Sequence, residues 1–266
     1  MQFFRFIFLA RSWAKDRAPL GEHIVDVAKH ANEAKGKLSL VIFPEGTLVS
    51  KDTRPMSKKY ADKRGIVSLF WSPSFPNPEQ LMRGYLWIDF QPDLQHTILP
   101  RSTGLLFILR SMAPTISDLK LLDITIGYPG IPPAGYAQDF YTLRSIFFQG
   151  IAPPAIHLHL RLYSMSEIPF GSVSASDSVE RGAEATAEET TVFERWLISR
   201  WVEKDCLMDS FYKNGDFLHA EGVLPTQQAE IPIRLRSLWE VGNALCFLAP
   251  IVVYYGFKSA WRKWLG

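Results

Sequence analysis

Residues 38–47 have the sequence LSLVIFPEGT, in which an apolar run ends at a proline and a polar turn. The run at residues 38–43 is short, apolar and partly β-branched, which predicts a buried β-strand. Pro44 would end this strand, and residues 45–47 would begin a loop at its C-terminal end. The stretch therefore indicates a strand that delivers polar residues to one edge of a sheet.

The segment before this strand is expected to be a helix. Residues 21–35 repeat apolar side chains at helical spacing, and Gly36 is a natural helix stop. A helix, a buried strand and a polar loop in this order are typical of an α/β fold. In such folds ligands bind at the C-terminal ends of the strands.

Four further elements follow from apolar patterning. Residues 97–101 predict a short strand, residues 104–112 a buried helix and residues 121–128 another strand. Residues 191–215 carry an apolar stripe at helical spacing and close at Asn214-Gly215, which indicates an amphipathic helix.

Residues 156–163, IHLHLRLY, alternate strictly and predict a half-buried strand. The four aliphatic side chains are expected on the buried face, with His157, His159 and Arg161 on the other. Two histidines at positions i and i+2 could begin a metal site, but no third ligand lies near them in the sequence. We expect a solvated polar face.

The composition excludes several functional classes. The net charge is only +2, from 29 basic and 27 acidic residues, which argues against a nucleic-acid partner held by long-range electrostatics. Two cysteines exclude a disulfide framework, and no Cys/His cluster has the spacing of a zinc site.

One segment has the character of a membrane span. Residues 241–257, VGNALCFLAPIVVYYGF, are apolar and have basic and aromatic residues on both flanks. They predict a transmembrane segment or re-entrant hairpin at about residues 238–258. The alternative is a helix buried in a protein core.

Three motifs occur in a fixed order along the chain. FIFLAR followed by WAKDR occupies residues 6–17, VIFPEGT residues 41–47 and ILPRSTG residues 98–104. This trio resembles the second, third and fourth motif blocks of the PlsC-like lysophosphatidic acid and lysophospholipid acyltransferases, in particular the lysocardiolipin-type branch. Residues 196–217 are similar to the C-terminal extension of that branch. The resemblance covers residues 1–66 and 92–217.

The resemblance implies roles for six residues. The implied substrate-binding residues are Arg11, Glu45, Gly46, Thr47, Pro100 and Arg101. Arg11 would contact the phosphate of the acceptor, because its planar guanidinium pairs bidentately with phosphate oxygens. Glu45 and Gly46 would shape the acceptor site, and Pro100 the acyl-CoA side.

The resemblance also implies the reaction and its setting. An acyl group would pass from acyl-CoA, as co-substrate, to a lysophospholipid, with no metal and no bound cofactor. The fold would be α/β, a mixed sheet flanked by helices with a C-terminal helical extension and a membrane segment. The location would be the endoplasmic reticulum or another internal membrane.

The sequence departs from the family pattern at two positions that bear on catalysis. The first block of the family is Asn-His, four residues and then Asp, and it supplies the general base. None of the six histidines here follows Asn or has Asp five positions later. We expect that Met1 is an internal methionine of a longer protein. Leu48 also stands where the family often has Arg; Arg54, Lys58 or Lys59 could compensate, or could belong to a solvated basic loop.

Residues 67–91 interrupt the family pattern and are expected to be an insert, either a family-specific loop or a retained intron. Val67-Ser68 can be encoded by GTAAGT and Gln91 by CAG, which are common intron boundaries. The expected organisation is a partial acyltransferase domain at 1–165, a flexible linker at 166–190, a C-terminal extension at 191–232 and the membrane segment at 238–258.

Two other functional classes stay open. The chain could be a non-catalytic lipid-binding protein derived from this family, since the His/Asp motif is absent. It could also be a membrane-tethered interaction domain, in which case a change at Glu45 would leave lipid binding unaltered.

Overall fold

The computed structural model describes residues 12–34, 38–63, 68–69, 91–92, 94–173, 185–218 and 227–232. The chain divides into two compact units, Met1–Val223 and Leu224–Gly266. Every helix and strand described below belongs to the first unit. These elements combine helices with a small antiparallel sheet, which is consistent with the α/β class.

Helices α1 (Trp13–Glu33) and α4 (Ser102–Met112) pack against each other. α4 is buried along nearly its whole length because its apolar side chains surround the helix, as the sequence predicts for residues 104–112. One face of α4 meets Leu20 and Ile24 of α1, and the ring of Trp13 packs edge-on against Phe107 at 5.2 Å.

Helix α8 (Ala187–Asn214) is the long amphipathic helix that the sequence predicts. It begins with a capping box, in which the Thr186 hydroxyl and the Glu189 carboxylate each accept a hydrogen bond from the other residue's backbone N–H. It ends at Gly215, whose φ of +82° is the left-handed conformation of a helix C-cap. Its apolar stripe packs on the other face of α4 and forms the largest core cluster with it.

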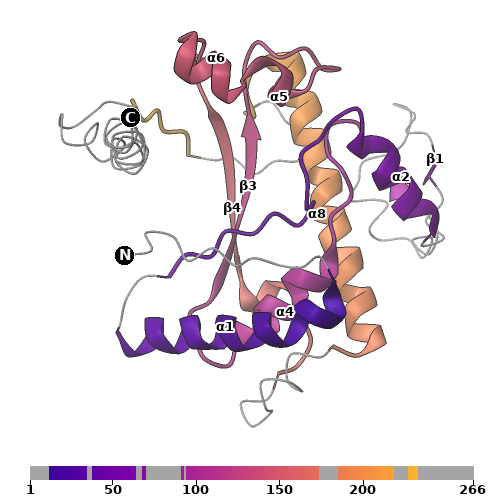
Figure 1. Ribbon diagram of the computed structural model, residues 1–266, viewed down its shortest axis with the longest axis vertical. Helices are drawn as coiled ribbons and strands as arrows, with labels where there is room; N and C mark the ends of the chain where they lie inside the picture. The colour runs from indigo at the N-terminus through magenta and orange to yellow at the C-terminus, as the bar shows by residue number, and fades with distance from the viewer. Residues whose placement is uncertain are drawn as a thin grey trace, which may run out of the picture. The chain divides into compact units, whose positions relative to one another are not determined.

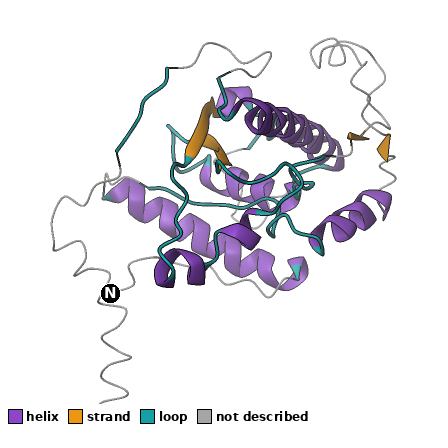
Figure 2. Cartoon of the chain, turned by 90° about the horizontal axis from the view of Figure 1, so that it is seen from above, coloured by secondary structure: helices purple, strands orange, loops and turns teal. Residues whose placement is uncertain are grey.

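Strands β3 (Lys120–Gly127) and β4 (His157–Ser164) form an antiparallel pair, with Ile124 opposite Leu160. Both strands lie where the sequence predicts them. The two strands form a long hairpin, whose connection at residues 128–156 contains two short helices. Figure 1 shows this hairpin standing beside α8, with α1 and α4 crossing near one end of it. In the view from above, the hairpin is seen nearly end-on beside the helices (Figure 2).

The predicted orientation of residues 156–163, with the aliphatic face buried and the polar face solvated, is wrong. The polar face, with Asp123, Thr125, His157 and His159, packs on α8, and the aliphatic face is 44–58% exposed. The exposed aliphatic side chains are Leu122, Ile124, Ile126, Ile156, Leu158, Leu160 and Leu162. The physical reason is that α8 offers ionic and aromatic partners to the polar face, so burying that face leaves its charges paired.

Two predicted strands are absent from the described residues. Residues 38–43 and 97–101 have no strand partner among the described residues. Along 38–43 burial still alternates, with Ile42 packed against both main core clusters and Val41 and Phe43 more than 70% exposed. The alternation of a strand is therefore present, but within the described ranges no neighbouring strand supplies backbone hydrogen bonds.

The remaining elements are short. They are α2 (Thr53–Lys63), β1 (Ser68–Leu69), β2 (Gln91–Pro92), α5 (Ala137–Phe140), α6 (Leu143–Phe148) and η1 (Met165–Glu167). β1 and β2 pair in parallel, so the two ends of the 67–91 segment lie side by side.

Several predictions concern residues outside the described ranges: Arg11, most of the 67–91 insert, the middle of the 166–190 linker and the membrane segment at 238–258. Within the described ranges, no helix combines the length and the apolar character that crossing a bilayer requires.

Candidate functional site

The loop at 43–47 and the loop that leads into α4 are joined by a backbone hydrogen bond. The Arg101 N–H donates to the Pro44 carbonyl at 2.8 Å, and Arg101 is the N-cap of α4. The structure thus brings together two sequence motifs that are more than fifty residues apart. Pro100 is buried beneath this contact, whereas the Arg101 side chain is exposed.

Gly46 shapes the turn of the 43–47 loop. Its N–H donates to the Phe43 carbonyl at 3.0 Å, and its φ of +72° lies in the left-handed region that favours glycine. No atom lies within 4 Å of where a Cβ would stand, so the backbone conformation is what requires glycine here. Thr47 follows on the exposed side of the turn.

The Glu45 carboxylate is half-buried and points to α8. The indole N–H of Trp201 donates to Glu45 Oε1 at 2.9 Å across 156 residues of sequence. Burial raises the pKa of Glu45, and the Trp201 hydrogen bond and the Lys204 charge oppose that rise. Asp205 adds a smaller contribution that also raises this pKa.

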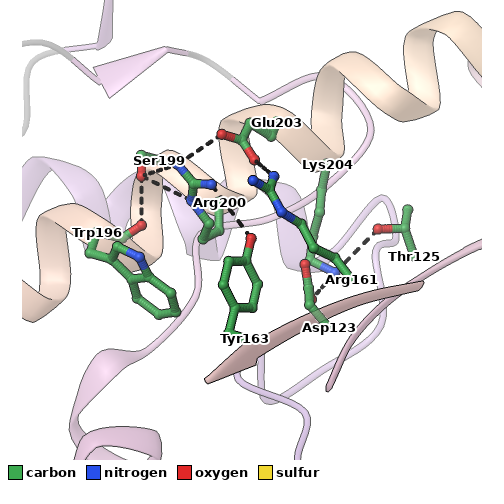
Figure 3. A network of polar contacts seen from close by, with 9 residues as sticks. All are labelled: Asp123, Thr125, Arg161, Tyr163, Trp196, Ser199, Arg200, Glu203 and Lys204. Carbon is green, nitrogen blue, oxygen red and sulfur yellow. Dashed lines mark hydrogen bonds and ion pairs between the residues drawn. The ribbon is translucent and has the colours of Figure 1, made fainter. Parts of the chain in front are cut away.

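Lys204 is buried beside this pair, with an exposed fraction of 6%. Its ammonium lies 2.5 Å from Asp123 Oδ1 and donates to the Ile124 carbonyl at 2.9 Å and to Thr125 Oγ1 at 3.3 Å. Figure 3 shows the ammonium between Asp123 and Thr125 of β3. It also lies 5.1 Å from the centre of the Trp201 ring, within cation–π range.

Asp205 holds the loop that precedes Pro100. Its carboxylate accepts backbone N–H bonds from Gln95, His96 and Thr97 at 2.8–2.9 Å, and a further bond from the Thr97 hydroxyl at 3.1 Å. Such a set of donors suits a carboxylate, which has four acceptor lone pairs. Helix α8 thereby fixes the loop that carries the 98–104 motif.

Glu203 ties α8 to the second strand of the hairpin. It accepts from Arg161 of β4 and from Arg200 of α8, both at 2.8 Å (Figure 3). Arg200 also reaches the Tyr163 hydroxyl at 3.5 Å. Burial raises the pKa of Glu203, and the two arginines oppose that rise. The two ion pairs thus favour the charged form of a carboxylate whose burial disfavours it.

The basic residues after Leu48 do not form a loop. They lie on α2, where Arg54 donates to the carbonyls of Leu94 and Gln95. Lys58 and Lys59 are exposed on the same helix. Arg54 therefore anchors α2 to the loop before Pro100. The expected loop is a helix, although Lys58 and Lys59 on it are solvent-exposed as expected.

The sequence predicts a solvated face for His157 and His159, and the structure places them differently. His157 packs on the Phe211 ring at 5.3 Å and His159 on the Phe217 ring at 6.1 Å, so these partly buried side chains contact aromatic neighbours of α8 and the segment after it. Burial lowers the pKa of His159. Among the described residues, no group of three or more His, Cys, Asp or Glu has a geometry that could hold a metal ion.

The structure therefore brings five of the six predicted residues, 45–47 and 100–101, into neighbouring loops, and the sixth, Arg11, lies outside the described ranges. Sequence reasoning missed Trp201 and Lys204 as partners of this site. The sequence did contain a sign of this role for Lys204. The lysine interrupts the apolar stripe of α8 about one turn after Trp201. A charged residue at a core position needs a buried partner.

Comparisons with known proteins agree with the motif resemblance. The family model described as "Acyltransferase C-terminus" matches residues 184–246, which include all of α8. The chain is 29% identical over 247 residues to the 2-acyl-1-lysophosphatidylinositol acyltransferase of Saccharomyces cerevisiae, covering 82% of this chain and 51% of that protein.

Two animal proteins show more distant similarity. Lysocardiolipin acyltransferase 1 of Danio rerio is 22% identical, over 80% of this chain and 41% of its own length. Lysophosphatidylinositol acyltransferase 10 of Caenorhabditis elegans is 25% identical, over 78% of this chain and 39% of its own length. The chain thus spans about half the length, or less, of these curated relatives. No solved structure matches it.

Proposed function

We propose that this chain, which resembles the PlsC-type acyltransferases, is part of an enzyme that transfers an acyl group to a lysophospholipid. One observation carries the proposal. Two ordered motifs of that family, at 41–47 and 98–104, meet through the Arg101–Pro44 hydrogen bond and are held by α8, where the family model matches.

The proposed donor is acyl-CoA. A hydroxyl oxygen of the lysophospholipid attacks the thioester carbonyl, the carbon–sulfur bond breaks, and CoA leaves as the thiol with the proton that the hydroxyl gives up. A general base accelerates such a step, and donors aimed at the developing oxyanion stabilise it. No resident metal or cofactor takes part in this scheme. The base of the family lies in the Asn-His-x4-Asp motif, which these 266 residues lack.

The contribution proposed for this chain is the binding of the acceptor. Glu45 would accept hydrogen bonds from hydroxyls of the acceptor, and Gly46 and Thr47 would shape the loop around it. Arg11 would pair with the acceptor phosphate. Pro100 and Arg101 would form the neighbouring wall on the acyl-CoA side. Their placement in adjacent loops supports these roles for residues 45–47 and 100–101.

We also propose that the protein works at an internal membrane such as the endoplasmic reticulum, with residues 238–258 crossing or entering the bilayer. The apolar run at 241–257 and its basic and aromatic flanks support this placement. A lysophospholipid acceptor is itself a component of membranes.

The test compares Glu45→Gln with the wild-type protein encoded by the full-length transcript. Transfer of a labelled acyl group from acyl-CoA to lysophosphatidylinositol is measured beside the binding of lysophosphatidylinositol. A hydrogen bond to a charged group contributes about 1.5–3 kcal/mol, so acceptor KM and Kd should rise about tenfold or more. Glu188→Gln, an exposed carboxylate in the first turn of α8, is the control and should change neither constant.

The second candidate is a lipid-binding protein without catalysis, which the missing Asn-His-x4-Asp motif favours. Saturable binding that depends on Glu45, with no acyl transfer, would establish this candidate. If the wild-type protein neither binds lysophosphatidylinositol nor transfers an acyl group to it, the proposal is wrong in both forms.

A further inference from the structure

Glu45 has one side-chain partner among the described residues, and that partner comes from α8. Trp201 donates its indole N–H to Oε1 at 2.9 Å. An indole N–H is a donor only and lies in the plane of a rigid ring. The direction of this hydrogen bond is therefore set by how the Trp201 ring is held. Oε2 accepts no protein hydrogen bond within the described ranges.

The Trp201 ring is fixed from two sides. It is 7% exposed and belongs to the core cluster that α8 forms with α4. The Lys204 ammonium lies over its face at 5.1 Å. That ammonium is itself anchored on β3 by the Asp123 carboxylate, the Ile124 carbonyl and the Thr125 hydroxyl. Three acceptors match the three donors of a lysine.

The result is a connected series of contacts from β3 through α8 to the 43–47 loop. Asp123 positions Lys204, Lys204 lies against Trp201, and Trp201 directs one oxygen of Glu45. The other oxygen, Oε2, is left for a ligand. A partly desolvated carboxylate in a turn would otherwise be free to rotate towards solvent, since Gly46 and Thr47 beside it are exposed.

We infer that Trp201 and Lys204 are positioning residues for Glu45, so that helix α8 and the 43–47 loop together build the lysophospholipid acceptor site. This inference rests on the proposed function. It assigns to the segment that matches the acyltransferase C-terminus a part in acceptor binding.

Trp201 and Lys204 also affect the pKa of Glu45. Burial raises its pKa, while the Trp201 hydrogen bond and the Lys204 charge lower it; Asp205 of α8 acts with burial. Removing the Trp201 N–H therefore raises the pKa of Glu45 further. A function that needs the carboxylate ionised is lost as pH falls through this pKa, so its acid limb moves to higher pH.

The experiment uses Trp201→Phe, which keeps an aromatic ring in the cluster but removes the N–H donor together with part of the indole ring. For the protein from the full-length transcript, acceptor KM for lysophosphatidylinositol should rise about fivefold to tenfold. The value of kcat should change less than twofold, and the acid limb of kcat/KM should move to higher pH. Trp196→Phe is the matched control on the same helix, because Trp196 packs on Tyr163 and Phe193.

A double variant separates positioning from general damage to the fold. In a Glu45→Ala background, Trp201→Phe should have almost no further effect on KM, because the oxygen that accepts its N–H is gone. Equal KM values and pH profiles for Trp201→Phe and Trp196→Phe would overturn the inference. Additive losses in the double variant would also overturn it. A wild-type protein that neither binds nor acylates lysophosphatidylinositol would overturn the proposed function itself, and the inference with it.

Discussion

Glu203, Lys204 and Asp205 are consecutive residues of α8, and each holds a different part of the molecule. Glu203 pairs with β4, Lys204 with β3, and Asp205 with the backbone of residues 95–97. Successive helical residues point about 100° apart, so three neighbours can reach three directions. Through these three residues α8 holds both strands and the 95–97 loop in place around the candidate site.

The contribution of Asp205 is testable by itself. Asp205→Asn replaces one acceptor oxygen by an amide donor, which faces backbone N–H groups that also donate. We expect the free energy of unfolding to fall by about 1–3 kcal/mol, measured by urea denaturation.

Asp118→Asn is the control for this change, because Asp118 is 83% exposed and pairs only locally with Lys120. Its effect should stay within about 0.5 kcal/mol. If both variants unfold at the same urea concentration, the Asp205 contacts do not hold the 95–97 loop.

At the scale of elements, the hairpin and α8 approach each other closely where β3 ends. A Cβ built on Gly127 would lie 2.8 Å from ring atoms of Phe211 on α8. Glycine is required there by space, since its φ is not in the left-handed region. Gly127 meets Phe211 at the C-terminal end of β3, whereas Asp123 meets Lys204 near the middle of the strand. At the other end of the hairpin, Tyr163 packs on Trp196. The hairpin therefore meets α8 along most of its length.

Gly127→Ala should therefore force the strand and the helix apart. The expected cost is about 1–3 kcal/mol of unfolding free energy, the range for overpacking, measured by thermal or urea unfolding. Gly104→Ala is the matched control in α4, where nothing lies within 4 Å. It should stabilise the protein by up to about 1 kcal/mol through helix propensity. Equal effects of the two changes would contradict the close packing of β3 on α8.

Local patterns predicted some elements well and others not. α4, α8, β3 and β4 follow from apolar periodicity, because each has enough residues for its period to be distinct. Residues 38–43 have the composition of a strand, yet a strand also needs a partner edge, which a local pattern cannot reveal. For residues 156–163 the alternation identified two faces correctly but not which face would meet α8.

The residues of the candidate site also differ in whether a local sequence pattern reveals them. Glu45, Gly46, Pro100 and Arg101 could be found from short motifs in a fixed order. The link from Trp201 to Glu45 spans 156 residues and depends on the register of α8 against the loop, so no local pattern contains it.

At the scale of the whole molecule, helices α1, α4 and α8 and the 38–47 segment form the packed part of the described chain. The outer face of the hairpin leaves seven aliphatic side chains 44–58% exposed. An apolar area of this kind is unusual on a soluble monomer. We propose that the lysophospholipid binds at the 43–47 loop and α8, not on this exposed face.

The most direct measurement is photo-crosslinking of the full-length protein with a lysophospholipid that carries a diazirine close to its headgroup. Labelled peptides are identified by mass spectrometry, with and without excess unlabelled lysophospholipid. We expect competed labelling of peptides that contain residues 44–47 and 196–205. Competed labelling confined to the outer face of β3 and β4, or labelling that excess ligand does not reduce, would contradict it.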